Sequence, residues 1–435
     1  MHIVLISKVF APAMGYLENV LPKYLARRGA KVDVVASSLA PSYHQGPIPL
    51  ADGELRPGLA PGSVEPMEGF RLHVLGHDRI CGQLRLAGLG QTLEKLQPDI
   101  VQTMTPIGWI AAAAAWHRRR LGYRLFSGCH YHASVFPLAQ IKSSAFQPAR
   151  MRCFLERSVH GRVVSWVTEK YYAISPDCAE VARRFFGVPA AKLEICPLGV
   201  DTEVFHLASG PAERGERASL RARLGFGEAE IVCVYSGRFG EDKNPLLLAR
   251  AIARLAVSGE HYRGLFVGEG PQAAEIAKCR GCVVQPFMPM SKLGGYYRAA
   301  EIGVWPTQES MSMLDALACG LPLVANDTMR AKERLEGTGM AYRLGDVDDL
   351  VWKLRALGAA GLRAEMGAEG ARRMREKFSW EAIAARRIRD YEAALETKGT
   401  TAQRASLTMA HAEEAGASLR NSEWRDTECR MRGRL

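Results

Sequence analysis

Short apolar runs alternate with amphipathic segments along the first two hundred residues. The run HIVLISKVF at 2–10 is rich in branched side chains, and Pro12 and Gly15 end it. From Leu17 onward, apolar residues recur at the spacing of one helical face, and the apolar run GAKVDVVAS follows at 29–37. A strand, a helix and a second strand in this order predict a βαβ unit and a parallel sheet with right-handed crossovers.

The same alternation continues and then starts again. Further strand signals lie at 98–105, 124–132, 170–175 and 192–200, and around 205–230 the pattern loosens into charged, glycine-bearing text. A second series of strands and helices runs from IVCVYSGRF at 231–239 to VDDLVWKLRAL at 347–357. Both series predict doubly wound α/β domains, whose ligands bind beyond the carboxyl ends of the strands.

The length supports two domains, because a chain of 435 residues exceeds the roughly 250–300 residues that one core holds. We predict two Rossmann-like domains, residues 1–207 and 208–375, facing a central cleft. An amphipathic helix is expected at 376–396. Residues 397–435 are polar and mixed in charge, which predicts a weakly ordered tail.

The composition limits which partners the protein is expected to bind and in which cellular compartment it is expected to lie. The net charge of +11 suits an anionic partner, and no nucleic-acid-binding module accompanies it. Among ten scattered cysteines, Cys279 and Cys282 have metal-like spacing but lack a second pair, so no metal site is predicted. The most apolar run, IGWIAAAAAWH, is shorter than the roughly 20 residues that span a membrane. With no signal-like start, the expected location is the cytoplasm.

Two loops at strand ends carry candidate anion-binding groups. In FAPAMGYLEN at 10–19, a tight turn leads into a helix whose N–H groups suit a phosphate, although any such turn favours proline and glycine. In SGRFGEDKN at 236–244, Arg238 and Lys243 are placed to clamp a diphosphate. The alternative for this pair is a solvated surface loop.

Histidines and acids form the other candidates. His130 and His132 share one face of a strand end, which suits zinc or a single hydrogen-bonding histidine, and no third metal ligand accompanies them. Glu309 lies in a loop before a helix. Ser312 and Asp315 resemble a capping box, with Ser312 as the N-cap, so Asp315 has a structural alternative to a role in the site.

Eight motifs in order resemble the group 1 retaining glycosyltransferases of the GT-B fold. They are APAMGYLEN, CHYH, AISPDCAEV, CPLGVDTEVF, SGRFGEDKN, FVGEGP, WPTQESMSMLDALACGLPLVAND and FSWEAIAARRIRDYEAAL, and they extend the resemblance over residues 1–396. The resemblance implies that Arg238 and Lys243 hold the donor diphosphate and that His130, or alternatively His132, contacts the transferred sugar. It also implies contacts to the donor from Met14, Gly15 and Glu269, and it matches Glu18 to a family acid.

The family's paired acids match Glu309, which would bind the donor sugar's hydroxyls, and Asp315, which would bind the ribose. Only five residues separate them, fewer than in the family's usual pattern, so the ribose contact is the less secure. Backbone N–H groups of Ser310, Met311 and Ser312 would face the sugar and phosphate. The last helix would cross back onto the first domain.

The resemblance implies retaining, metal-independent transfer without a cofactor, from a UDP- or GDP-linked sugar to a hydroxyl of a glycan, lipid-linked or small-molecule acceptor. Alternatives are a GT-B-like nucleotide-sugar epimerase or hydrolase, and a non-catalytic GT-B binding protein. The basic stretches WHRRRLGYR and KSSAFQPARMRCFLERSVHGR also suit peripheral contact with an anionic membrane, or a solvated basic face.

Overall fold

The computed structural model describes residues 1–10, 16–39, 48–49, 55–56, 59–80, 82–133, 136, 151, 155, 159–329 and 331–397. Residues 1–385 form one compact unit, and residues 386–435 form a second. In the second unit, residues 386–397 are helical, and the tail predicted beyond them lies outside the described residues. No helix in the described ranges has the length and apolar character needed to span a membrane.

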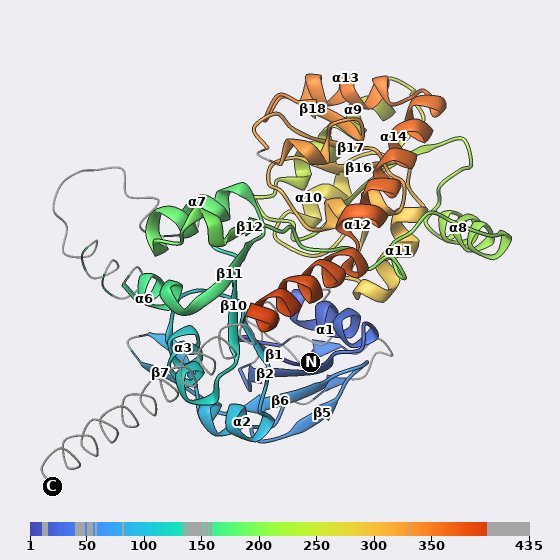
Figure 1. The fold of residues 1–435 in the computed structure, drawn as a ribbon. Helices are drawn as coiled ribbons and strands as arrows, with labels where there is room; N and C mark the ends of the chain where they lie inside the picture. The colour runs from blue at the N-terminus through green and yellow to red at the C-terminus, as the bar shows by residue number, and fades with distance from the viewer. Residues whose placement is uncertain are drawn as a thin grey trace, which may run out of the picture. The chain divides into compact units, whose positions relative to one another are not determined.

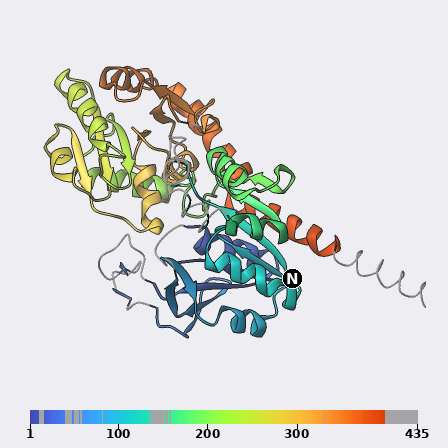
Figure 2. The same ribbon diagram turned by 90° about the vertical axis from the view of Figure 1, so that its left-hand side faces the viewer.

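The first sheet is built from the first half of the chain (Figures 1 and 2). Its spatial order is β12-β11-β10-β9-β1-β2-β6-β5, and the pairs are parallel except β5 with β6. The strands are β1 (His2–Ile6), β2 (Lys31–Ser37), β5 (Val64–Pro66), β6 (Arg71–Leu75), β9 (Ile100–Thr103), β10 (Arg124–Cys129), β11 (Thr168–Ala173) and β12 (Leu193–Ile195). The direction in which successive strands are added reverses between β1 and β9. The strands β2, β6 and β5 lie on one side of β1, and β9 to β12 lie on the other.

Helices and short ladders complete this part of the chain. The helices are α1 (Leu17–Arg27), α2 (Leu89–Leu96), α3 (Trp109–Leu121), α6 (His160–Val167) and α7 (Pro176–Phe186), with a 3-10 turn at η2 (Ala190–Lys192). Two antiparallel pairs join β3 (Ile48–Pro49) to β4 (Leu55–Arg56) and β7 (His77–Ile80) to β8 (Gln83–Leu86). The strands β1 and β9 are buried throughout, which agrees with the apolar runs at 3–6 and 100–101, although the buried set also includes the polar His2, Gln102 and Thr103.

The second sheet is wholly parallel, in the order β15-β14-β13-β16-β17-β18. Its strands are β13 (Ile231–Ser236), β14 (Tyr262–Val267), β15 (Cys282–Gln285), β16 (Ile302–Trp305), β17 (Leu323–Asn326) and β18 (Gly339–Tyr342). Helices α9 (Pro245–Val257), α10 (Ala273–Lys278) and α13 (Val347–Ala356) pack together on it (Figure 1). So do α11 (Met290–Arg298), α12 (Ser312–Ala318) and α14 (Ala360–Arg373). A 3-10 turn at η3 (Lys332–Arg334) and a π turn at η4 (Met374–Phe378) complete the elements.

The strands and helices predicted from 231 to 357 are confirmed. Helix α8 (Pro211–Arg223) is among the elements that were not predicted, and it lies in the stretch where the apolar pattern loosens. This helix is mostly polar and buries only Leu220 and Arg221, so it has almost no apolar stripe to detect. The buried Arg221 guanidinium donates to the carbonyl of Ala299 and pairs with Glu301, which fixes α8 against the segment that leads into β16.

The link between the two sheets is anchored on α1. Tyr24 donates to Asp201 at 2.8 Å, and Lys23 pairs with Glu203 at 2.8 Å. Val200 forms a parallel bridge with Ser379, and a Cβ atom on Gly199 would lie 2.5 Å from the Trp380 ring. The residues that follow β12 are therefore held by contacts to both α1 and the segment after η4.

Candidate active site

The order of the second sheet reverses between β13 and β16. From β13 the chain adds β14 and β15 on one side, whereas β16, β17 and β18 are added on the other. The loops that leave β13 and β16 therefore start at this switch point, and ligands of doubly wound sheets bind beyond the carboxyl ends of the strands at such a point. Arg238 and Lys243 follow β13, and Glu309 follows β16.

Backbone contacts join the loops after β13 and β14. The N–H of Phe239 donates to the carbonyl of Glu269 at 2.8 Å, and Gln272 donates back to Phe239 at 3.1 Å. Gly268 has a φ of +147°, and a Cβ atom there would lie 2.0 Å from the Gly237 carbonyl, so only glycine permits this approach. The exposed Glu269 thus lies beside the loop that carries Arg238 and Lys243.

The two basic residues of this loop differ in their electrostatic surroundings. Arg238 is exposed and makes a bidentate pair with Asp242 at 2.8 and 2.9 Å. Lys243 is partly buried, and its ammonium group has no ion pair or hydrogen bond among the residues that the structure describes. Burial lowers the pKa of Lys243 from its usual value; the Asp242 carboxylate opposes this shift, and Arg238 adds to it. A partly desolvated cation that makes no direct ion pair or hydrogen bond is suited to an anionic ligand.

Glu309 lies in the loop between β16 and α12, as predicted, and side chains from β17 and β18 hydrogen-bond to the backbone of this loop. Tyr342 donates to the carbonyl of Pro306 at 2.6 Å, and Asn326 donates to that of Thr307 at 2.7 Å. The Glu309 carboxylate accepts the N–H of Ala331 at 3.0 Å and lies 3.9 Å from the guanidinium of Arg334. These contacts hold the carboxylate beside a buried cation.

The capping box predicted at Ser312 is wrong. Helix α12 begins at Ser312, its N-cap is Met311, and no side chain caps it. The Ser312 hydroxyl instead accepts from the Trp305 indole at 3.1 Å and hydrogen-bonds with Ser310 at 2.7 Å. These partners compete with the backbone for the hydroxyl, so Ser312 ties the start of α12 to the end of β16 rather than capping the helix.

The N–H groups at this helix start remain available. Within the described chain, no acceptor is found for the N–H groups of Ser310, Met311 and Ser312. Asp315 lies one turn further along α12. Burial raises the pKa of Asp315 well above its usual range, and the nearby Asp201 carboxylate adds to the shift. Asp315 is therefore held toward its neutral form, which can donate a hydrogen bond as well as accept one.

The two histidines follow β10 in the first sheet and have different neighbours. A Cβ atom on Gly128 would lie 3.1 Å from Nε2 of His130, so this ring lies back over the strand end. Nδ1 of His132 lies 3.3 Å from the Asp177 carboxylate, which also accepts the N–H of Ala133 at 2.8 Å. Asp177 belongs to the first turn of α7, whose N-cap is Ser175. Met14 and Gly15 lie outside the described residues.

Two family models match the chain in succession. Glycosyltransferase Family 4 matches residues 21–204, and Glycosyl transferases group 1 matches residues 230–359, which together exceed half of the chain. The chain belongs to the group 1 glycosyltransferases. The first model includes both histidines and Asp177, and the second includes Arg238, Lys243, Glu309 and Asp315.

Individual relatives and solved structures agree with this assignment. A D-inositol 3-phosphate glycosyltransferase of Geodermatophilus obscurus is 28% identical over 411 residues, 88% of this chain and 84% of the relative. Sucrose-phosphate synthase from Thermosynechococcus elongatus has a TM-score of 0.64 at 19% identity, covering 91% of this chain and 99% of that one. Anabaena HepE in complex with UDP-glucose has a TM-score of 0.63 at 15% identity, covering 91% and 100%. The protein is a glycosyltransferase with the GT-B fold.

Sequence reasoning missed two residues of the candidate glycosyltransferase site. Arg334 supports Glu309 from a 3-10 turn, and Asp177 holds the turn that carries His132. Neither follows from spacing, because each lies far along the chain from the residue that it contacts. The basic residues in the stretch MRAKERLEG at 329–337 are the sequence feature that could have pointed to Arg334.

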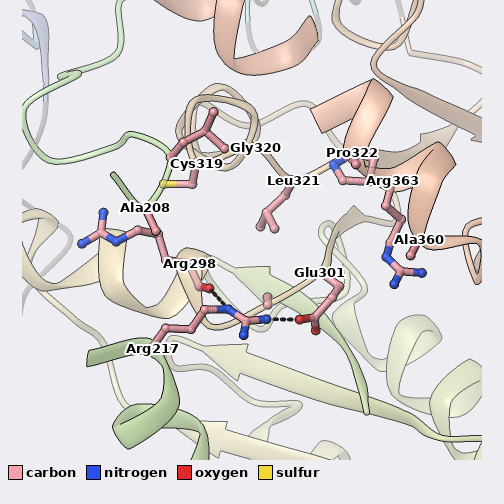
Figure 3. A pocket seen from close by; sticks show the side chains of 13 residues that line it. Ala208, Arg217, Arg298, Glu301, Cys319, Gly320, Leu321, Pro322, Ala360 and Arg363 are labelled. Atoms are coloured by element: carbon pink, nitrogen blue, oxygen red, sulfur yellow. Dashed lines mark hydrogen bonds and ion pairs between the residues drawn. The ribbon is translucent and has the colours of Figure 1, made fainter. Parts of the chain in front are cut away.

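A cavity of about 360 Å³ lies at the amino ends of strands β16 and β17 in the second sheet (Figure 3). Its lining includes Ala300 and Glu301, directly before β16, and Pro322, directly before β17. Arg217 donates to the Arg298 carbonyl at 2.7 Å and pairs with Glu301 across it. Because this is the amino edge of the strands, the cavity is separate from the residues that follow β13 and β16. Among the described residues, no group of three or more His, Cys, Asp or Glu suits a metal ion.

Glu18, in the first turn of α1, is expected to make the stability of the glycosyltransferase depend on pH. Burial raises the pKa of Glu18 from 4.5 to about 7. The Glu18 carboxyl group therefore binds a proton more tightly in the folded state than in the unfolded state. Its contribution to the stability of the fold is fully present below pH 4.5 and is lost as the pH rises to about 7. Above that pH, the buried, ionised carboxylate destabilises the fold.

We expect Glu18→Gln to stabilise the fold by about 3 kcal/mol at pH 8 and to have little effect near pH 4.5. Melting temperatures of wild type and variant at the two pH values measure this difference. Glu365→Gln, at an exposed position of α14, is the matched control. An equal shift at both pH values would contradict the assignment of the buried proton to Glu18.

Proposed function

We propose that the protein transfers a sugar from a UDP- or GDP-linked donor to a hydroxyl of a glycan, lipid-linked or small-molecule acceptor. The observation that supports this proposal most is Lys243, a partly buried cation whose ammonium group makes no ion pair or hydrogen bond among the described residues and which lies in the same loop as Arg238 at the sheet's switch point. An anionic diphosphate would supply the missing countercharge, and the same cations would stabilise it as a leaving group. The binding of UDP-glucose by HepE, which has the same fold, supports this donor class.

The proposed roles follow the loops around this point. Arg238 and Lys243 would bind the diphosphate, and the N–H groups of Ser310, Met311 and Ser312 would contact the phosphate and the sugar. Glu309 would accept hydrogen bonds from the sugar hydroxyls. Glu269, Met14 and Gly15 would border the donor, and Asp315, held toward its protonated form, would contact the ribose.

Transfer is proposed to occur with retention and without a metal ion. In this mechanism the acceptor hydroxyl attacks the anomeric carbon on the face that the diphosphate leaves. The bond from carbon to the leaving oxygen breaks as the bond to the acceptor oxygen forms, and the departing phosphate takes the acceptor's proton. His130, or alternatively His132 with Asp177, would orient the sugar by hydrogen bonding. The carboxylate of Glu309 would bind and position rather than attack.

The name of the relative from Geodermatophilus obscurus makes an inositol phosphate the first small-molecule acceptor to test. A phosphorylated acceptor is also consistent with the net charge of +11. We propose a cytoplasmic location, with peripheral contact to the membrane.

Isothermal titration of the full chain with UDP and with GDP tests the donor proposal. We expect one nucleotide to bind with a clear preference over the other, and binding of neither would refute the proposal. Incubation with donor alone then separates the alternatives. Rapid turnover without any acceptor would favour an epimerase or hydrolase, and nucleotide binding without turnover under any acceptor would favour a binding protein.

A further inference from the structure

Three side chains between the end of β16 and the start of α12 form a hydrogen-bonded chain that the proposed mechanism does not use. Trp305 is the last residue of β16 and is 1% exposed, and its indole nitrogen lies 3.1 Å from the hydroxyl oxygen of Ser312. The Ser312 hydroxyl lies 2.7 Å from that of Ser310, which directly follows Glu309. The chain therefore leads from a buried strand end to a partly exposed residue beside Glu309.

The indole group sets the direction of this chain. An indole N–H can only donate a hydrogen bond, so the Ser312 oxygen accepts from Trp305. Within the described part of the protein, the O–H of Ser312 lies within 3.5 Å of two acceptors, Ser310 Oγ at 2.7 Å and the Ser236 carbonyl at 3.4 Å. The first distance is the usual one between hydroxyl groups and the second is longer than the usual range, so Ser312 donates to Ser310.

The other polar groups around Ser312 fix the position of its oxygen. The Ser236 carbonyl, at the end of β13, also lies 3.3 Å from the Trp305 indole nitrogen. The buried Tyr297 hydroxyl, which comes from α11 and also interacts with Ser312, lies 2.5 Å from the Ser236 hydroxyl. The Ser312 side chain is therefore enclosed by the ends of two neighbouring strands and by one helix.

Ser310 is left with an O–H group that is available to a ligand. Because its oxygen accepts from Ser312, its own hydrogen points elsewhere, and no other acceptor contacts it in the part of the chain that the structure describes. Its backbone is held, since the Ser310 carbonyl accepts the N–H of Met313 at 3.3 Å and an N–H of Arg334 at 3.5 Å. Ser310 is partly exposed, so a bound ligand can reach the hydroxyl.

We propose that the Ser310 hydroxyl donates a hydrogen bond to the sugar-bearing phosphate of the nucleotide-sugar donor, and that Ser312 and Trp305 are positioning residues for it. A hydroxyl whose oxygen already accepts a hydrogen bond is a stronger donor, because hydrogen bonds in a chain polarise one another. An ionised phosphate oxygen only accepts hydrogen bonds, so it matches the donating end of this chain. The inference rests on the proposed function, because it assigns a further side chain to the same donor site.

Titration of the full chain with a nucleoside diphosphate and with the matching monophosphate tests the phosphate contact. UDP and UMP, or GDP and GMP, are used according to the diphosphate that wild type prefers. Ser310→Ala is expected to weaken binding of the diphosphate about tenfold, the loss typical of one hydrogen bond to a charged group, and to leave binding of the monophosphate unchanged. With the nucleotide sugar, kcat should fall about 10–100-fold, because the leaving diphosphate gains charge in the transition state.

A double-mutant cycle tests the positioning role of Ser312 and Trp305. Ser312→Ala and Trp305→Phe are each expected to lower kcat about fivefold when Ser310 is present, and to have almost no effect when Ser310 is already alanine. A purely structural role would lower kcat by the same factor in both backgrounds and would contradict the positioning role. Trp305→Phe keeps an aromatic ring in the core, and melting temperatures establish that each variant is folded.

Ser291→Ala is the matched control, because Ser291 is an exposed serine on the neighbouring helix α11. This variant should bind both nucleotides and turn over as wild type does.

Unchanged diphosphate binding and unchanged kcat in Ser310→Ala would overturn the inference, as would equal weakening of monophosphate and diphosphate binding. If Ser310→Ala raised only KM for the nucleotide sugar, the hydroxyl would contact the sugar and the assignment to the phosphate would be wrong. Each of these outcomes leaves the donor proposal intact. If wild type bound neither nucleoside diphosphate, the donor proposal would fail and this inference would fail with it.

Discussion

Replacing Lys243 with alanine is expected to lower kcat by about 10²–10³-fold, the range found when one group that stabilises developing charge is removed. Lys243 is partly buried and has no direct ion pair among the described residues, so no salt bridge of its ammonium group has to break before the ligand binds. Arg238, by contrast, must exchange its bidentate contact with Asp242 for a contact with the diphosphate. We therefore expect Lys243→Ala to be more damaging than Arg238→Ala.

Calorimetry and steady-state kinetics check this expectation together. If Lys243 binds the diphosphate, Lys243→Ala should weaken binding of the nucleoside diphosphate but leave binding of the nucleoside unchanged. Lys278→Ala, at an exposed position of α10, removes a charge from the same part of the chain and serves as the control. Unchanged kcat and unchanged diphosphate affinity in Lys243→Ala would contradict the proposed donor site.

Replacing Glu309 with glutamine is expected to lower kcat by about 10²-fold while leaving nucleotide affinity nearly unchanged. The glutamine retains an acceptor for the Ala331 N–H, which now donates to Glu309 at 3.0 Å. It removes the negative charge beside Arg334 and replaces one acceptor oxygen with an N–H₂ donor. Binding of the sugar hydroxyls would weaken, whereas Arg238 and Lys243, the side chains proposed to bind the diphosphate, lie in the loop after β13 and are unchanged.

The measurement compares kcat, KM for the nucleotide sugar, and Kd for the nucleotide alone. Glu336→Gln, at an exposed position close to the same 3-10 turn, is the matched control. Because Arg334 is buried and would lose a nearby carboxylate, melting temperatures are needed to exclude unfolding. If Glu309→Gln turned over at the wild-type rate, Glu309 would have no role in positioning the sugar.

Local sequence patterns predicted much of the secondary structure. The series from β13 to α13 was predicted because each strand is a short apolar run and each helix has an apolar stripe, and both signals are contained within a few turns of chain. Helix α8 escaped prediction because its long-range contacts are made by arginines such as Arg221 rather than by an apolar face. The capping box at Ser312 failed because Trp305, a residue of the preceding strand, provides the hydroxyl with a tertiary partner.

The shortened spacing between Glu309 and Asp315 had raised doubt about the ribose contact. The structure adds a physical reason to examine it, because burial and Asp201 keep Asp315 toward the protonated state. A neutral carboxyl group can donate one hydrogen bond and accept others, so its behaviour toward ribose hydroxyls differs from that of an ionised glutamate.

The sequence by itself determined the order of strands and helices, the excess of positive charge, and the family motifs with their candidate residues. Only the tertiary structure decided that β13 and β16 pair side by side in parallel, which places Glu309 and Lys243 in loops at the same end of neighbouring strands. It also decided that Arg238 forms an ion pair with Asp242 whereas Lys243 forms none among the described residues, and that Arg334 lies beside Glu309. The physical reason is that secondary structure follows from neighbours along the chain, whereas charge pairing and burial depend on residues that only folding brings together.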